Sequence, residues 1–223
     1  MSTPLRLVLF DVDGTLVDSQ ASIVNCMTHS FQALSVDIPE REAILSIVGL
    51  SLPAAIARLA PDQPEAMRAA LVEGYKQAFH DQRLQTGVAS SPLFPGVREV
   101  IERLRVMPDV LLGVATGKSR RGLDALIEGH GLDGCFVTLQ VADHHPSKPH
   151  PSMVQAALAE TGVEQANAVM IGDTSYDMDM AAAAGIPGIG VTWGYHDHAT
   201  LTSAAHIIET FDQLPDVLVK LWN

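Results

Sequence analysis

The sequence predicts an α/β fold: a doubly wound, Rossmann-like parallel-sheet core with an inserted all-helical domain, called the cap below. From about residue 97 onward, short apolar runs of strand length alternate with amphipathic helical segments. No strand-like run occurs between residues 19 and 90. Because an all-helical stretch of that length is too long for a loop, we expect the core to comprise residues 1–17 and 90–223 and the cap residues 18–89.

The first expected strand, residues 7–10, is an unbroken apolar run that stops at Asp11 and Asp13. Such a run is typical of a strand buried on both faces in the middle of a parallel sheet. Open α/β sheets bind their ligands outside the carboxyl ends of the strands, so these carboxylates are candidates for a ligand or metal site. Residues 11–14 alone are equally compatible with a simple turn, since Asp and Gly favour turns.

The cap is expected to begin with a helix, for which Asp18 and Ser19 offer capping side chains. Its apolar residues recur at helical spacing, as do those of the later cap segments. We expect further cap helices over residues 40–47, 52–59 and 64–84, followed by a return linker over residues 86–95. In the last helix the expected buried stripe is Met67, Leu71, Tyr75 and Phe79.

The rest of the core is predicted as repeated strand and helix units. The expected strands are residues 110–115, 135–141, 168–171, 188–191 and a short one at 206–208. The first expected helix of this part begins near residue 97, and further helices are expected over residues 119–129, 152–161 and 176–184. A last helix is expected to carry Phe211, Leu214, Leu218 and Leu221. Such repeats predict a parallel sheet with right-handed crossovers and helices on both faces.

Composition and charge limit the class of protein. Hydrophobic residues make up 47% and charged residues 18%, which is a globular composition. The net charge of -12 argues against nucleic acid as a partner and is compatible with a metal site. Two cysteines without metal spacing suit a reducing compartment, and no apolar run approaches the roughly 20 residues of a membrane span. We therefore expect a cytoplasmic protein without a membrane partner; the oligomeric state is left open.

Reactive side chains come directly after three of the expected strands, and a further one lies in a loop. Because the carboxyl ends of parallel strands meet at one edge of the sheet, these groups are expected to converge. Carboxylates, a hydroxyl, an ammonium and glycine amides in one crevice suit a phosphoryl group with bound Mg²⁺, which prefers oxygen ligands. The residues concerned are Asp11, Asp13, Thr116, Gly117, Lys148, Asp173 and Asp177.

These residues resemble the four motifs of the haloacid dehalogenase superfamily, in the same order along the chain. The motifs are Phe-Asp-Val-Asp-Gly-Thr at residues 10–15, Ala-Thr-Gly at 115–117, Lys-Pro at 148–149, and Gly-Asp at 172–173 with Asp177. The helical segment after the first motif resembles the cap of the phosphoglycolate phosphatase-like branch. The resemblance extends over essentially the whole chain.

The resemblance implies a division of labour between the first two aspartates. Asp11 would attack phosphorus and become an aspartyl phosphate, while Asp13 would protonate the leaving alcohol and then activate water. Asp11, the backbone carbonyl of Asp13, and Asp173 would ligate Mg²⁺, with Asp177 acting through water or supporting the ligands.

The resemblance also assigns the phosphate-binding groups. Thr116 and the Gly117 amide would bind a phosphate oxygen, and Lys148 would neutralise both the nucleophile and the transferring group. The dehalogenases lack an acid at the position of Asp13, so its presence points to phosphate esters.

The predicted function is therefore that of a Mg²⁺-dependent phosphatase acting on a small phosphorylated metabolite. Phosphoglycolate is the leading substrate, with sugar phosphates, nucleotides and pyrophosphate left open. A β-phosphoglucomutase-like sugar phosphomutase is the nearest enzymatic alternative. A phospho-accepting signalling module or a non-catalytic phosphate-binding protein is an alternative of another class.

Several of these residues also have purely structural interpretations. Asp173 and Asp177 can cap the helix near residue 176, and Lys118 can be a solvated lysine in the first turn of a helix. The histidines at 144, 145 and 150 fit no compact zinc pattern and indicate a polar loop, and those at 196 and 198 are interpreted alike. The loop at residues 49–52 is either substrate-facing or part of the cap core.

Overall fold

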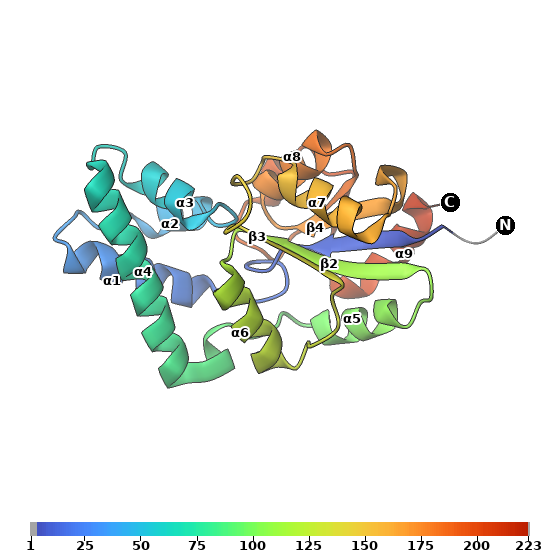
Figure 1. Cartoon of the computed structure of the whole chain (residues 1–223), viewed down its shortest axis with the longest axis horizontal. Coiled ribbons are helices and arrows are strands. Elements are labelled where there is room, and N and C mark those ends of the chain that lie inside the picture. The colour runs from blue at the N-terminus through green and yellow to red at the C-terminus, as the bar shows by residue number, and fades with distance from the viewer. Residues whose placement is uncertain (1–3, 223) are drawn as a thin grey trace.

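The computed structural model describes residues 4–222, which form an α/β core beside a helical cap (Figure 1). The core contains one six-stranded sheet in which every neighbouring pair of strands is parallel. Its strands lie in the order β3-β2-β1-β4-β5-β6. Their bounds are Arg6–Phe10 (β1), Val110–Thr116 (β2), Thr138–Val141 (β3), Ala168–Gly172 (β4), Gly188–Val191 (β5) and His206–Ile208 (β6).

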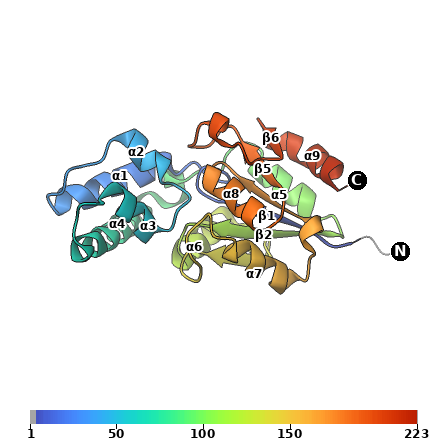
Figure 2. The same ribbon diagram turned by 90° about the horizontal axis from the view of Figure 1, so that it is seen from above.

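Helices cover both faces of the sheet (Figures 1 and 2). Val8 and Phe10 of β1 contribute to one apolar cluster with α5, α6 and α9, whereas Leu7 and Leu9 contribute to a second cluster with α7 and α8. This alternation follows from the period of two along a strand, and it confirms the predicted doubly wound sheet. The bounds are Val97–Arg105 (α5), Arg120–His130 (α6), Ser152–Thr161 (α7), Ser175–Ala183 (α8) and Leu214–Leu221 (α9).

The strand order places the carboxyl ends of β1 and β4 side by side at the centre of the sheet. Phe10 pairs with Val114 of β2 on one side and with Ile171 of β4 on the other. From β1 the chain adds β2 and β3 on one side of the sheet and then β4, β5 and β6 on the other, so the strand order switches sides between β1 and β4. Ligands of open α/β sheets bind in the crevice at such a switch point. The topology therefore makes the end of β1 the natural position for a site.

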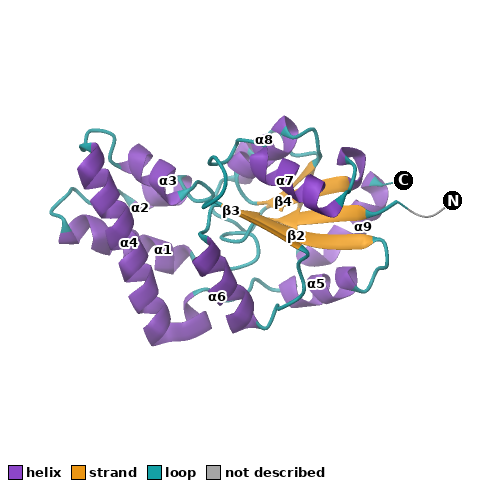
Figure 3. Cartoon of the chain, in the orientation of Figure 1, coloured by secondary structure: helices purple, strands orange, loops and turns teal. Residues whose placement is uncertain are grey.

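The cap consists of helices with an apolar core of their own, on one side of the core (Figure 3). Its helices are Gln20–Ala33 (α1), Arg41–Ser46 (α2), Leu52–Leu59 (α3) and Glu65–Thr86 (α4), and a 3₁₀ turn follows at Gly87–Ser90. Met27, Ile56 and Leu71, from three different helices, are buried in this core. The sequence pattern predicted a helix at the position of α1 and predicted α2, α3 and α4 to within two residues at each end.

Two expectations differ in detail from the structure. The segment expected as a linker over residues 86–95 includes the last residue of α4 and a 3₁₀ turn, because backbone bonds continue the helical path there. The strand expected from Cys135 begins only at Thr138, where pairing with β2 starts.

The division of the chain into a core of residues 1–17 and 90–223 and a cap of residues 18–89 remains our proposal. Residues 1–3 and 223 of these ranges lie outside the described residues. Within the described chain, no helix is both long and apolar enough to span a bilayer.

Candidate active site

Asp11 lies directly after β1 and is buried. Its Oδ1 accepts a hydrogen bond from Lys148 Nζ at 2.5 Å. Its Oδ2 is buried and has no hydrogen-bond partner among residues 4–222. Because a buried carboxylate oxygen without a donor or cation is costly, this oxygen is available for a ligand.

Lys148 lies between two carboxylates and is itself buried. Its Nζ donates to Asp11 at 2.5 Å and to Asp177 Oδ1 at 2.6 Å. Burial by itself would lower the pKa of Lys148, but these two carboxylates raise it above its ordinary value. Lys148 therefore keeps its positive charge in the interior of the protein.

Asp173 and Asp177, which frame the start of α8, differ in how their oxygens are used. Asp173 accepts one bond on each oxygen, from the Thr15 hydroxyl at 3.1 Å and from the Tyr195 N–H at 2.8 Å. Asp177 Oδ2 accepts from the Thr174 N–H and hydroxyl in a capping box at the start of α8, and its Oδ1 binds Lys148. The structural interpretation of Asp177 as a capping residue is thus correct, whereas Asp173 does not cap this helix.

Three buried carboxylates oppose a single ammonium at this site. Burial raises the pKa of Asp11 to about 7, and the negative charge of Asp177 acts in the same direction against Lys148. Burial, followed by the charges of Asp11 and Asp177, raises the pKa of Asp173 well above its ordinary value. Three negative charges against one positive charge leave a net charge of -2, so the cluster needs two protons or a divalent cation to be neutral.

The donor set suits a hard divalent cation. One oxygen from each of Asp11, Asp173 and Asp177 can be chosen so that the three lie within 4.8 Å of one another. Mg²⁺ is held by few carboxylates and keeps several waters. Asp11 Oδ2 has no partner among the described residues, and each oxygen of Asp173 accepts one bond. Asp177 is more heavily engaged, because its Oδ1 binds the charged Lys148 and its Oδ2 accepts two bonds from Thr174.

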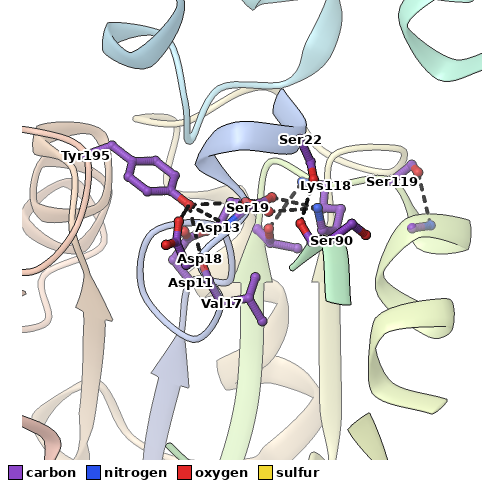
Figure 4. A network of polar contacts seen from close by, with 12 residues as sticks. Asp11, Asp13, Val17, Asp18, Ser19, Ser22, Ser90, Lys118, Ser119 and Tyr195 are labelled. Carbon is purple, nitrogen blue, oxygen red and sulfur yellow. Dashed lines mark hydrogen bonds and ion pairs between the residues drawn. The ribbon is translucent and has the colours of Figure 1, made fainter. Parts of the chain in front are cut away.

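The carboxylate of Asp13 belongs to a polar network with Ser19 and Lys118 (Figure 4). Its Oδ1 accepts from the Ser19 hydroxyl at 2.5 Å, and Lys118 Nζ lies 2.8 Å from both Asp13 oxygens. The backbone N–H of Ser19 in turn donates to the Tyr195 hydroxyl at 2.7 Å, so Tyr195 belongs to the same network. Asp11 and Asp13 therefore have different surroundings although they are two residues apart.

Gly117 lies where the core meets a cap loop. A Cβ at this position would lie 2.5 Å from the Leu50 carbonyl oxygen and 2.6 Å from that of Gly49. Only glycine allows such a close approach of two backbones. The neighbouring Thr116 is buried at the end of β2, and its Oγ1 accepts the Lys118 N–H at 3.2 Å. The loop at residues 49–52, interpreted above as either substrate-facing or part of the cap core, thus lies directly on the second motif, and Leu50 also contributes to the cap core.

Further contacts hold the cap on the core. The Ser51 N–H donates to Ser147 Oγ at 2.8 Å. Arg58 donates to the Tyr176 hydroxyl at 2.5 Å, and this hydroxyl donates to the Ser46 carbonyl at 2.9 Å. The cavity lined by Asp11 and Asp13 therefore lies between the cap and the core, with residues of both in its walls.

Comparison with known proteins agrees with this arrangement. A family model described as haloacid dehalogenase-like hydrolase matches residues 8–191. The chain belongs to this family. The hydrolase is 38% identical over 214 residues to a Dickeya dadantii protein named Probable phosphatase IndB, with 93% of this chain and 91% of that protein covered.

A second relative and a solved structure resemble the chain over almost its whole length. The hydrolase is 30% identical over 216 residues to a phosphoglycolate phosphatase of Mesorhizobium japonicum, covering 96% of this chain and 94% of that protein. A solved structure described as a predicted phosphatase from Clostridium acetobutylicum superimposes with a TM-score of 0.85, covers 98% of this chain and 100% of that one, and is 23% identical. At that identity the solved structure shows the shared fold alone.

The histidines of the hydrolase have diverse positions. His145 lines the cavity, and its ring nitrogens contact Ser152 Oγ and Gln140 Oε1, both at 2.8 Å. His144 and His150 are exposed on the same loop. His196 packs edge-on against Tyr176 at 5.2 Å between ring centroids, and His198 is exposed.

Four site residues were not identified from the sequence in their observed roles. Lys118 is not a solvated lysine: its side chain is only 10% exposed because it pairs with Asp13. Ser19 does not cap α1, since its hydroxyl donates to Asp13 instead. Thr15 and Tyr195 both hold Asp173, and no spacing signal predicts either contact.

Proposed function

We propose that this hydrolase is a Mg²⁺-dependent phosphomonoester hydrolase that acts on a small phosphorylated metabolite through an aspartyl phosphate on Asp11. The observation that carries the proposal is Asp11 Oδ2, which is buried and lacks a hydrogen-bond partner among the described residues, in a residue that lines the cavity between cap and core. A carboxylate beside a buried ammonium and a metal-binding carboxylate is a competent nucleophile toward phosphorus.

The proposed metal ligands are Asp11, the backbone carbonyl of Asp13, and Asp173. Asp177 would support them indirectly, because its Oδ1 binds the Lys148 ammonium and its Oδ2 accepts two bonds from Thr174, whereas each Asp173 oxygen accepts a single bond. Bound Mg²⁺ would supply positive charge against the phosphoryl oxygens as the transition state forms.

In the first half-reaction, an oxygen of Asp11 forms a bond to phosphorus as the bond from phosphorus to the ester oxygen breaks. Asp13 donates a proton to that oxygen, which leaves as the alcohol. Lys148, the hydroxyl of Thr116 and the Gly117 amide offset the charge on the transferring group. The cap limits access of bulk water during this step.

In the second half-reaction, a water molecule attacks the phosphorus of the aspartyl phosphate. Asp13, now ionised, takes a proton from this water, and the bond between phosphorus and Asp11 breaks. The products are inorganic phosphate and the original Asp11 carboxylate. Ser19 and Lys118 hold the Asp13 side chain in position for both proton transfers.

Phosphoglycolate is the first physiological compound to test, because the Mesorhizobium japonicum relative carries the name phosphoglycolate phosphatase. The direct test of the proposal is release of inorganic phosphate from 4-nitrophenyl phosphate with and without Mg²⁺. The Asp11→Asn variant is compared with Asp62→Asn, which alters an exposed cap carboxylate. We expect activity in the wild type and in Asp62→Asn only, each with Mg²⁺ present.

Two outcomes would contradict the proposal. Equal activity of Asp11→Asn and the wild type would exclude Asp11 as the nucleophile. Conversion of a sugar phosphate to its isomer without release of phosphate would show a phosphomutase instead.

A further inference from the structure

The cavity between cap and core is larger than a small leaving group requires. Its volume is about 630 Å³. A water molecule occupies about 30 Å³, so the space has room for roughly 20 of them. Cavities of 300–1,000 Å³ with mostly apolar walls are typical of sites for ligands of drug size. A phosphoryl group and glycolate alone would leave most of this cavity to water.

One face of α4 forms the cap wall of this cavity. Tyr75, Phe79 and Arg83 recur every four residues and therefore lie on one face of the helix, about 6 Å apart along its axis. The rings of Tyr75 and Phe79 lie 5.9 Å apart, and both side chains are only partly buried although they border the cap core. Two aromatic rings thus face the cavity rather than filling the interior of the cap.

Phe79 lies next to the position of the leaving group. Lys118 Nζ is 2.8 Å from the carboxylate of Asp13 and 5.1 Å from the centre of the Phe79 ring. If Asp13 protonates the leaving alcohol, that alcohol lies beside Asp13 and hence near the ring of Phe79. An apolar or aromatic leaving group would remove this ring from water.

Beyond Phe79 the cavity is lined by two arginines without acidic partners. Arg83 comes from α4 and Arg121 from α6, and neither pairs with a carboxylate among residues 4–222. Arg121 donates instead to the ring of His80 at 2.9 Å. Guanidinium groups bind carboxylates and phosphates through paired hydrogen bonds, so two arginines that line the same cavity can hold an anionic group of a ligand there.

Aspartates also line the cavity, but their positions do not oppose this interpretation. Asp11 and Asp13 belong to the catalytic end and pair with Lys148 and Lys118. Asp143 accepts the backbone N–H of Arg120 at 2.7 Å, at the start of α6.

We propose that the substrate is a phosphate monoester of a bulky alcohol that has an aromatic or otherwise apolar body and a second anionic group at its far end. The apolar body lies against Phe79 and Tyr75, and the second anion binds Arg83 and Arg121. This inference rests on the proposed phosphatase function and makes its substrate class specific. Phosphoglycolate has the second anion but lacks the apolar body.

Three phosphate esters separate the contribution of the apolar body from that of the second anionic group, because their leaving alcohols differ in these two features. They are phosphoglycolate, benzyl phosphate and 4-carboxybenzyl phosphate, compared by kcat/KM with Mg²⁺ present. We expect kcat/KM for 4-carboxybenzyl phosphate to be about tenfold higher than for benzyl phosphate, because its carboxylate adds a hydrogen bond to a charged arginine. Benzyl phosphate should in turn exceed phosphoglycolate.

Variants assign these preferences to residues. Phe79→Ala should lower kcat/KM at least about tenfold for both benzyl esters and leave phosphoglycolate nearly unchanged. Phe79→Leu, which keeps an apolar side chain and the packing of the cap, should show a smaller loss. Arg83→Gln should abolish the advantage of 4-carboxybenzyl over benzyl phosphate, whereas Arg68→Gln, on α4 but not part of the cavity lining, should not.

The outcomes separate this inference from the proposed function. A preference for phosphoglycolate, or equal losses for all three esters in both Phe79 variants, overturns the inference and leaves the phosphatase proposal intact. If both Arg83→Gln and Arg121→Gln retain the higher kcat/KM for 4-carboxybenzyl phosphate, the claim that a second anionic group binds these arginines is overturned. Absence of Mg²⁺-dependent turnover of all three esters removes the phosphatase proposal, and this inference with it.

Discussion

Replacement of Lys148 by Met tests the electrostatic balance of the site. The side chain is buried, and its Nζ contacts Asp11 at 2.5 Å and Asp177 at 2.6 Å. Methionine fills a similar volume but leaves three buried carboxylates without their ammonium. Breaking a buried ion pair by removing one partner costs about 3–5 kcal/mol. For a chain of this size that corresponds to a fall of roughly 6–20 °C in Tm.

The loss should depend on pH in a defined direction. Burial raises the pKa of Asp11 from 3.8 to about 7, and Lys148 is the main group that lowers it. In Lys148→Met the pKa of Asp11 therefore rises further. A carboxyl with a raised pKa in the folded state contributes stability at low pH, and that contribution is lost as the pH rises through the folded-state value. The difference between variant and wild type should thus be small near pH 5 and largest near pH 8.

The assay is thermal unfolding followed by circular dichroism in EDTA, so that no metal replaces the lost charge. Lys220→Met, on the exposed side of α9, serves as the matched control and should change Tm by only a degree or two. Equal Tm values for the two variants near pH 8 would refute the view that Lys148 neutralises the cluster. A deficit that is larger near pH 5 than near pH 8 would refute the assigned direction of the pKa shift.

Three other predictions follow from the site. Asp13→Asn should lower kcat by about 10²–10⁴, more for alkyl esters than for 4-nitrophenyl phosphate, while calorimetry should find Mg²⁺ affinity unchanged; weaker Mg²⁺ binding would place its side chain in the metal site. Gly117→Ala should push back the loop at Gly49 and Leu50, 2.5–2.6 Å from the added Cβ, and lower kcat/KM about 10²-fold; wild-type kinetics would contradict the tight closure. Mg²⁺ affinity should increase from about pH 5.5 to about pH 8, because protons compete for Asp11 below its pKa of about 7; a flat titration would exclude Asp11 as a ligand.

The positions of Asp11 and Asp173 were predictable because both follow fully apolar strand runs. Once β1 and β4 are recognised as parallel strands, their carboxyl ends must lie at the same edge of the sheet. The apolar period of the cap helices likewise predicted an independent core. These features follow from local patterns and from one general rule of topology.

The contacts of Ser19, Lys118 and Tyr75 were not predictable in the same way. A serine before a helix is a good cap, and only the folded chain shows its hydroxyl bound to Asp13 instead. Periodicity places Tyr75 on the apolar face of α4, but it does not reveal whether that face is covered by the cap core or borders a cavity. Both distinctions depend on how cap and core meet, which involves residues far apart in the sequence.

The central claim is that Asp11 carries the phosphoryl group, and rapid acid quenching followed by peptide mass spectrometry tests it most directly. With 4-nitrophenyl phosphate and Mg²⁺, the wild type should yield a phosphorylated peptide whose modified residue is Asp11. Asp13→Asn should accumulate more of it, because activation of water in the second half-reaction is impaired. A phosphorylated Asp11→Asn protein, or continued turnover in the wild type with phosphate found on another residue, would contradict the mechanism.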